Sequence, residues 1–383
     1  MDVTDVPTVV VGGGQAGLAM SRQLQRRGVE HVVLEAGPRV GGSWRERWDS
    51  LRLFTPARYD GLPDLPYPGP GWACPGHAEF ADHLESYVGR FALPVRTGVR
   101  VNRVGRVGDA LVVQTSAGSL TARDVVVATG ADRVPRLPDL GAPLDPAIVQ
   151  VHSAAYRRPD QLPPGDVLVV GAGNSGADIA LELARTHRVH LSGRHPGEVP
   201  WRVESVPARP LAAATFWAFA HVLTESTPPG RRVRAQVRAH SGPLIRVKSR
   251  DLAAAGVQRV ARTVGVRDGL PVLADGRVLP VTALVWCTGF APGLEVLDVP
   301  VLDGEGEAVH QRGVTAVPGV YVLGRTFQHA LASSMIGGVG RDAAYVAAHI
   351  AARSAGATQD PRPGPPRGQE ARAQSSTPSR PFS

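Results

Sequence analysis

The chain has 383 residues, a formal net charge of +8 and 43% hydrophobic residues, which suits about two domains and is too apolar for a disordered chain. Its two cysteines, Cys74 and Cys287, exclude a disulfide framework, a cysteine-rich metal site and a CxxC redox pair. No apolar run reaches the roughly 18 residues needed to span a bilayer. Because the first five residues form no basic leader, we expect a cytoplasmic protein without a transmembrane segment.

The positive charge is concentrated in two places. Residues 231–250 hold seven Lys and Arg residues and no acid, and residues 355–383 carry a net charge of +2. Taking both from +8 leaves −1, so the rest of the chain is close to neutral. The stretch 231–250 has no interleaved aromatic residues, which argues against nucleic acid as a partner. We expect a solvated face or a rim that attracts phosphate.

The N-terminal sequence predicts a strand, a glycine-rich turn, a helix and a second strand. Residues 8–11 are a short apolar run typical of a buried parallel strand, GGGQAG follows, and residues 31–34 are the next strand. Small residues in such a turn let the backbone approach a pyrophosphate at the helix N-terminus. A carboxylate after the second strand accepts the hydroxyls of an adenine ribose. The contacts predicted here are Gly12, Gly14, Gln15, Ala16, Gly17 and Glu35.

The same pattern recurs about 160 residues later, with a strand at residues 167–170, the turn GAGNSG and a strand at residues 189–191. Where the first repeat has Glu35, the second has Ser192, followed two residues later by Arg194. A guanidinium pairs with a ribose 2′-phosphate, whereas a glutamate would repel it. We therefore predict FAD or NAD at the first turn and NADPH at the second. The second set of contacts is Gly171, Gly173, Asn174, Ser175, Gly176, Ser192 and Arg194.

Two further apolar strands, at residues 125–128 and 283–287, end in Thr-Gly and follow their glycine turns by roughly 115 residues. A late strand at residues 318–324 and a helix at residues 340–350 complete the ordered part. These elements add Thr129, Gly130, Thr288, Gly289 and Gly324 to the predicted cofactor contacts, which also include Val101. Two dinucleotides in one chain imply hydride transfer between them, and flavin with nicotinamide is the usual pairing.

These segments resemble the flavin-containing monooxygenase-like flavoproteins of bacteria, which are related to the plant and animal flavin-containing monooxygenases. The matching stretches are VVVGGGQAGLA, VVLEAGPRVGGSWRERWDSLRLFTPARYDGLP, VVVATG, VLVVGAGNSGADIALELA, WCTGF and PGVYVLG. Together they cover about residues 1–350. The stretch around GGSW is the most specific, and the resemblance implies that Gly42, Ser43 and Trp44 lie beside the flavin and the FAD pyrophosphate.

The resemblance implies an α/β fold with two Rossmann-like dinucleotide-binding domains, the NADPH domain being inserted into a discontinuous FAD domain. The expected parts are residues 1–158 and 286–354 for FAD, 159–285 for NADPH, and a disordered tail at 355–383, which is rich in Pro, Arg, Gln and Ser.

The resemblance also implies a mechanism. NADPH reduces FAD, O2 adds at flavin C4a, and bound NADP+ shields the hydroperoxide from water. One oxygen atom then passes to a small organic substrate with a nucleophilic nitrogen or sulfur, or with a carbonyl group. The expected partners are this substrate and O2, with a homodimer as one assembly state. No metal is predicted, because the histidines lack metal-ligand spacing.

The sequence departs from this family at three places. The linker signature Phe-x-Gly-x3-His-x3-aromatic keeps His152 and Tyr156 but lacks its Phe and Gly. Thr55 lies in the stretch where typical members place an Asn near flavin C4a, and Arg325 follows Gly324 where related flavoproteins have Asp. We keep Thr55 and His152 as candidate catalytic residues, with a structural hydrogen bond as the favoured role of His152.

Two alternative functions remain open. The first is an NADPH oxidase or flavin reductase without oxygenation, and the second is a non-catalytic flavoprotein that senses redox state through FAD and NADP(H). The apolar stretch 211–223 predicts a packed helix, and a lid over a lipophilic substrate is its alternative role.

Overall fold

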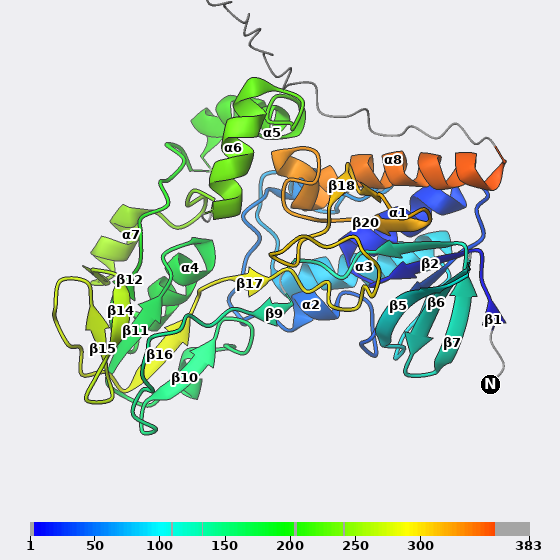
Figure 1. Ribbon diagram of the computed structural model, residues 1–383. Helices are drawn as coiled ribbons and strands as arrows, with labels where there is room; N and C mark the ends of the chain where they lie inside the picture. Colours follow the sequence, from blue (N-terminus) through cyan, green and yellow to red (C-terminus); the bar gives the residue numbers. More distant parts are fainter. Residues whose placement is uncertain (1–3, 109, 132, 203–204, 240–241, 357–383) are drawn as a thin grey trace, which may run out of the picture.

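Two large sheets, one in each half of the molecule and both built mainly from parallel strands, organise the fold (Figure 1). The computed structural model describes residues 4–108, 110–131, 133–202, 205–239 and 242–356. Nearly all of the tail predicted at 355–383 therefore lies outside the described residues.

The first sheet contains β2, the strand before the first glycine turn, and β2 is buried on both faces. Its strands run in the order β18, β19, β20, β8, β2, β3 and β4, and the last five are parallel. Alternate residues of β2 face opposite cores, as expected for a central strand. Val10 faces helices α1 and α8, and Val9 faces the core on the other side. The elements are β2 (Thr8–Val11), α1 (Gln15–Gln25), β3 (Val32–Leu34), β4 (Val95–Arg96), β8 (Asp124–Val127), β18 (His310–Gln311), β19 (Val314–Thr315), β20 (Val320–Val322) and α8 (Ile336–Ser354).

Smaller elements surround this sheet. A four-stranded sheet in the order β1, β7, β6 and β5 packs its apolar side against the face opposite α1 and α8. Helix α3 contacts both α1 and α2 (Figure 1). These elements are β1 (Thr4–Asp5), α2 (Gly42–Arg45), the short helix η1 (Ala57–Tyr59), α3 (His77–Phe91), β5 (Val101–Val107), β6 (Ala110–Thr115) and β7 (Gly118–Ala122).

The second sheet has five parallel strands in the order β10, β16, β11, β12 and β13. Strand β10 pairs with β16 although it precedes residue 159, where the sequence places the boundary of the NADPH domain. The domain limits remain a prediction. The elements are β10 (Val149–His152), η2 (Pro159–Gln161), β11 (Asp166–Val170), α4 (Asn174–Leu183), β12 (Arg188–Ser192), α7 (Ser249–Ala254), β13 (Gln258–Val260), the hairpin β14 (Thr263–Arg267) and β15 (Leu270–Leu273), and β16 (Ala283–Trp286).

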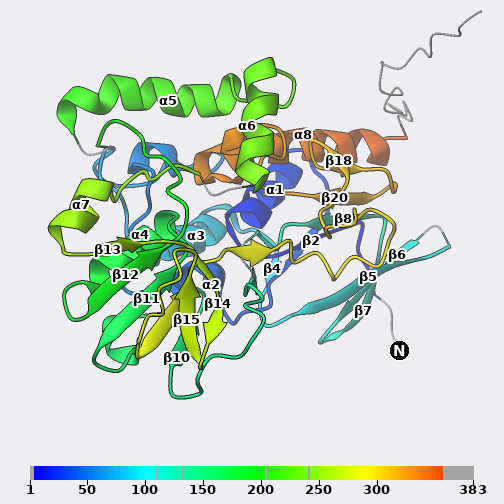
Figure 2. The same ribbon diagram turned by 60° about the vertical axis from the view of Figure 1, so that its left-hand side comes forward.

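The stretch predicted as a packed helix forms α5 (Arg209–His221), preceded by η3 (Val206–Ala208) and followed by α6 (Pro228–Ala239). Both helices lie on the same side of the molecule as α8 (Figure 2), and α5 contacts η4 (Leu331–Ser334). Phe216 is buried, whereas Trp217 is exposed. Within the described ranges, no helix combines the length and apolar character needed to cross a bilayer.

The chain passes between the two halves twice, and the two crossings pair with each other. Strands β9 (Val134–Pro135) and β17 (Phe290–Ala291) form a short antiparallel ladder. Figure 1 shows them midway between the two large sheets. The first half is therefore built from both ends of the chain, and the second half from its middle.

Candidate functional site

The first glycine turn is closed on its inner side and open on its outer side. Gly12 has a φ of +111°, and a Cβ there would lie 2.6 Å from the carbonyl oxygen of Ala128. A Cβ at Gly17 would lie 1.8 Å from the carbonyl oxygen of Gly12. A Cβ at Gly14 would meet nothing within 4 Å. The open side lies at the N-terminus of α1, whose first N–H groups have no partner within the helix, so it suits a pyrophosphate.

Glu35 lies beside this turn with its carboxylate held by the backbone. Its Oε2 accepts a hydrogen bond from the Gly13 N–H at 2.6 Å, and its Oε1 accepts one from Gly37 at 2.7 Å. Each carboxylate oxygen can accept a second hydrogen bond, which leaves room for ribose hydroxyls. At the start of α1, the Gln15 side chain accepts a hydrogen bond from the indole N–H of Trp44 at 3.0 Å. These side chains fit an adenosine dinucleotide.

The remaining predicted contacts of the first half lie at different depths. Gly324 lies two residues after β20, and a Cβ there would lie 2.9 Å from the Cβ of Ala16, so this segment lies close to the start of α1. Gly42 and Ser43 begin α2, and a Cβ at Gly42 would meet open space. Val101 lies at the start of β5, buried in the apolar core.

The second turn repeats the geometry of the first. A Cβ at Gly171 would lie 2.1 Å from the carbonyl oxygen of Cys287, and one at Gly176 would lie 1.8 Å from that of Gly171. Ala128, which precedes Thr129, and Cys287, which precedes Thr288, therefore occupy equivalent places beneath the two turns. Burial raises the pKa of the Cys287 thiol to about 12, so this cysteine is protonated at neutral pH.

Two polar residues predicted to contact the nicotinamide cofactor are engaged within the protein. The Ser192 hydroxyl accepts a hydrogen bond from the Thr263 N–H at 2.8 Å. The Asn174 side chain donates to the carbonyl of Pro243 and accepts from the N–H of Ile245, both at 3.0 Å. These bonds fix the loops around the start of α4, which also carries Ser175. Their contact with a cofactor stays a prediction.

Two arginines lie beside the end of β12. Arg194 is exposed directly after Gly193, and the Arg259 guanidinium donates to the carbonyl oxygen of Gly193 at 2.7 Å. Burial lowers the pKa of Arg259. No sequence motif marks Arg259, because it lies 65 residues after Arg194, on β13, and only the strand order brings it to this corner.

Thr55 is buried and donates a hydrogen bond from its hydroxyl to the Oδ1 of Asp60. Asp60 is fully buried, and its Oδ2 has no hydrogen-bond partner among the described residues. Burial raises the pKa of Asp60 to about 7, and the Thr55 hydrogen bond opposes this shift. Nothing in the sequence pattern marks Asp60, because a lone aspartate after a tyrosine is common on protein surfaces.

Both ring nitrogens of His152 are engaged. Its Nδ1 accepts a hydrogen bond from the Ala154 N–H at 3.1 Å, so Nε2 carries the proton and donates to the Gly289 carbonyl at 3.2 Å. Burial lowers the pKa of His152. The bond from Nε2 connects β10 to the residue before β17, and the role of His152 stays a prediction.

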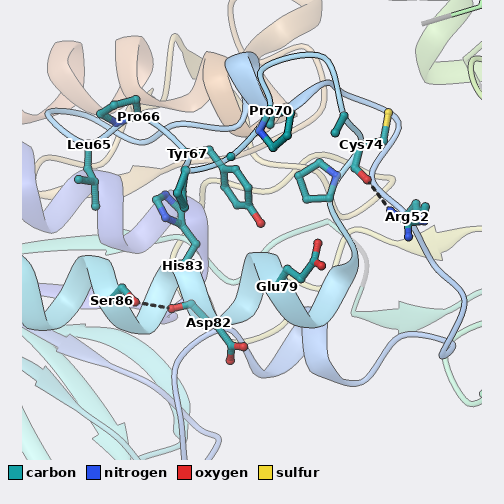
Figure 3. Close-up of a pocket in the computed structure, with 15 residues that line it drawn as sticks. Arg52, Leu65, Pro66, Tyr67, Pro70, Cys74, Glu79, Asp82, His83 and Ser86 are labelled. Atoms are coloured by element: carbon teal, nitrogen blue, oxygen red, sulfur yellow. Dashed lines mark hydrogen bonds between the residues drawn. The ribbon is translucent and has the colours of Figure 1, made fainter. Parts of the chain in front are cut away.

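A cavity of about 670 Å³ lies between α3 and the proline-rich loop of residues 65–75 (Figure 3). Its lining includes Arg52, Tyr67, Cys74, Glu79 and His83, and none of the residues predicted from the glycine turns. His83 is 5% exposed, and its Nε2 has no partner in the described part of the chain. No sequence motif marks this cavity, because it is formed where a loop folds back on a helix.

The basic stretch 231–250 does not form one surface. Arg231 and Arg232 are exposed on α6, whereas Arg246 pairs with Asp178 at 2.7 Å. Lys248 is buried and donates from its ammonium to the Val199 carbonyl at 2.8 Å. Among the residues that the structure describes, no three His, Cys, Asp or Glu side chains gather in a group able to hold a metal ion.

Comparison with known proteins agrees with this geometry. Residues 9–324 match the family described as pyridine nucleotide-disulphide oxidoreductase. The chain belongs to this family. It is 35% identical over 343 residues to an uncharacterized oxidoreductase CzcO-like of Geobacillus kaustophilus, which covers 89% of this chain and 97% of that protein. It is 36% identical over 181 residues to the indole-3-pyruvate monooxygenase YUCCA1 of Oryza sativa, which covers 46% of this chain and 45% of that protein.

Among solved structures, the flavin-containing monooxygenase from Stenotrophomonas maltophilia is similar, with 29% identity and a TM-score of 0.68 over 92% of this chain and all of that one. The prediction of a flavin monooxygenase-like oxidoreductase with two dinucleotide-binding domains, using FAD and NADPH, is confirmed. The family description names disulphides, yet Cys74 and Cys287 form no disulphide with each other. In this pyridine nucleotide-disulphide oxidoreductase they form no dithiol pair.

Proposed function

We propose that this protein is an NADPH-reduced, FAD-dependent monooxygenase that inserts one oxygen atom from O2 into a small organic substrate with a nucleophilic nitrogen or sulfur, or with a carbonyl group. The observation that carries the proposal is the pair of equivalent glycine turns, one beside a carboxylate and the other beside two guanidinium groups. When bound, FAD supplies two-electron redox chemistry between NADPH and O2. A cytoplasmic location and a homodimer remain predictions.

The first turn would hold FAD. The N–H groups at the start of α1 would bind the pyrophosphate, with the open space at Gly14 receiving it. Glu35 would accept hydrogen bonds from the ribose hydroxyls. Gly42, Ser43 and Trp44 would lie beside the flavin, as the resemblance implies, and the Gln15 hydrogen bond keeps the Trp44 ring in place.

The second turn would hold NADPH. Arg194 and Arg259 flank the end of β12, where the ribose of a dinucleotide bound at this turn would lie. Two guanidinium groups suit a doubly charged 2′-phosphate, because each can donate two parallel hydrogen bonds to it. Ser192 would shape this corner through its hydrogen bonds rather than contact the phosphate.

Positioning and water exclusion, rather than acid–base catalysis, would be the protein's main contributions. His152 has no free nitrogen to move a proton. Helix α5 covers the loop that carries Thr55, since the rings of Phe216 and Tyr59 lie 4.5 Å apart. This apolar cover favours a lipophilic substrate that reacts as a nucleophile without help from a base.

The proposal is tested by supplying NADPH and O2 with an amine, a thioether or a ketone and measuring the H2O2 released per NADPH consumed. A monooxygenase releases less H2O2 than it consumes NADPH once a suitable substrate is present. One H2O2 per NADPH with every substrate would indicate the oxidase alternative. Failure of NADPH to reduce the bound flavin would indicate the sensor alternative and contradict the proposal.

A further inference from the structure

The two chain crossings meet the first half of the molecule at neighbouring points. Gly130 lies four residues before β9, and Pro292 directly follows β17. Because β9 and β17 pair with each other, they form one two-stranded linker between the sheets (Figure 1). Any rotation of one half relative to the other must bend or twist this linker at its attachment points.

The Arg325 side chain holds both attachment points. It is only 4% exposed, and its Nη1 donates to the carbonyl oxygen of Gly130 at 3.1 Å and to that of Pro292 at 3.0 Å. Its Nη2 lies 3.0 and 2.9 Å from the two carboxylate oxygens of Glu307. One planar guanidinium thus joins three segments through four hydrogen bonds, whereas the ammonium group of a lysine has only three donors.

Both ends of this contact are fixed. Glu307 belongs to a tight turn in which its N–H donates to Asp303 Oδ1 at 2.9 Å. Arg325 directly follows Gly324, which lies close to Ala16 at the start of α1, where the FAD pyrophosphate would bind. The guanidinium therefore connects the FAD corner to the linker through one side chain. An ion pair of this kind, with Arg325 buried and Glu307 34% exposed, adds little net stability, so geometry is its main contribution.

We infer that Arg325 is a positioning residue that clamps the two-stranded linker and thereby sets the orientation of the NADPH-binding half relative to the FAD-binding half. The kinetic consequence rests on the proposed function: hydride transfer needs the two cofactor sites at a fixed distance and angle. The clamp itself does not rest on that function, because it is defined by contacts within the chain.

Limited trypsin digestion of the flavin-loaded protein tests the clamp directly, because the linker offers cleavage after Arg133 and Arg136, both exposed. We expect Arg325→Met to speed cleavage at these sites by about tenfold, since opening of a released segment exposes it to the protease. The matched control is Arg312→Met, which removes another half-buried ion pair, with Asp342 at 3.1 Å, away from the linker. Equal cleavage of the two variants would overturn the inference.

Anaerobic mixing with NADPH provides the second readout. We expect Arg325→Met to retain FAD but to reduce it about tenfold more slowly at saturating NADPH, while reduction by dithionite is unchanged. Arg325→Lys should recover part of the rate at most. If Arg325→Met does not fold, Glu307→Gln removes the carboxylate charge and keeps the side chain's shape, and the same two measurements apply.

The two readouts separate the possible failures. If NADPH does not reduce the wild-type flavin, the proposed function is wrong, and trypsin still decides the clamp. If neither the linker cleavage nor the reduction rate changes in Arg325→Met, Arg325 has no positioning role. If cleavage accelerates in both Met variants alike, the effect is loss of stability, and the inference is also wrong.

Discussion

At the scale of single residues, the two glycine turns differ mainly in what stands after the neighbouring strand. Glu35 is fixed by two backbone N–H groups, which present its carboxylate to a ribose and would repel a phosphate there. The second turn has no acid at the equivalent place and has Arg194 and Arg259 nearby. The direction of electron flow in the proposed function depends on this difference.

Removal of either arginine should change the preference between nicotinamide cofactors. We expect Arg194→Ala and Arg259→Ala to raise the KM for NADPH by about 10- to 100-fold and leave that for NADH nearly unchanged, since a hydrogen bond to a charged group contributes about 1.5–3 kcal/mol. Steady-state kinetics with both cofactors measure this. Arg185→Ala, at the far end of α4, is the control. Equal losses with NADPH and NADH would remove the residue from the 2′-phosphate site.

The two ends of the first turn should respond differently to one added methyl group. At Gly14 the Cβ meets open space, so Gly14→Ala should leave the thermal stability of the apoprotein unchanged and weaken FAD binding. At Gly17 the Cβ would lie 1.8 Å from the Gly12 carbonyl oxygen, so Gly17→Ala should lower the Tm of the apoprotein itself. Apoprotein melting and flavin titration distinguish the two effects. Tight FAD binding by Gly14→Ala would show that the pyrophosphate lies elsewhere.

Asp60 should make stability depend on pH. Its pKa is raised to about 7 by burial, whereas an unfolded aspartate titrates near about 3.9, so the folded state binds more protons between these values. Stability is therefore highest below about pH 4 as far as this group is concerned, and falls as pH rises towards 7. Asp60→Asn should abolish this fall. Urea unfolding at pH 5 and pH 8 tests it, and an identical pH dependence in both proteins would contradict the assignment.

At the scale of elements, local patterns predicted some features and could not predict others. The strands before both turns are continuous apolar runs, so β2 and β11 could be located from residue type alone. The placement of β10 in the second sheet depends on its pairing with β16, some 130 residues away, and no local signal encodes it. The same reason hides Arg259, which reaches the NADPH corner through strand order, and the clamp made by Arg325.

Helix α5 should depend on its buried edge alone. Phe216 packs against Tyr59 and is buried, so Phe216→Ala should destabilise the protein by about 3–5 kcal/mol. Trp217 is 59% exposed, so Trp217→Ala should stay within about 0.5 kcal/mol of the wild type. Equilibrium unfolding in urea compares the two neighbours. A larger loss for Trp217→Ala would show that the exposed face of α5 contributes to folding.

At the scale of the whole molecule, the chain repeats one dinucleotide-binding unit and connects the two copies by a short two-stranded linker. The two turns have the same geometry, since a Cβ at Gly17 or at Gly176 would lie 1.8 Å from the carbonyl oxygen of the first glycine of its turn. Two such sites in one chain are useful only if a hydride passes between their ligands. The net charge of +8 says little about function. The basic side chains of residues 231–250 are in part exposed, in part paired with acids and in part buried, as Lys248 is.

The fate of molecular oxygen tests the central claim most directly. The enzyme is given NADPH, a thioether and ¹⁸O₂, and the product is analysed by mass spectrometry alongside the H2O2 formed. We expect one ¹⁸O atom in the sulfoxide and a smaller yield of H2O2 than of oxidised NADPH. Complete recovery of the electrons from NADPH as H2O2, with no label in any organic product across thioethers, amines and ketones, would contradict the account.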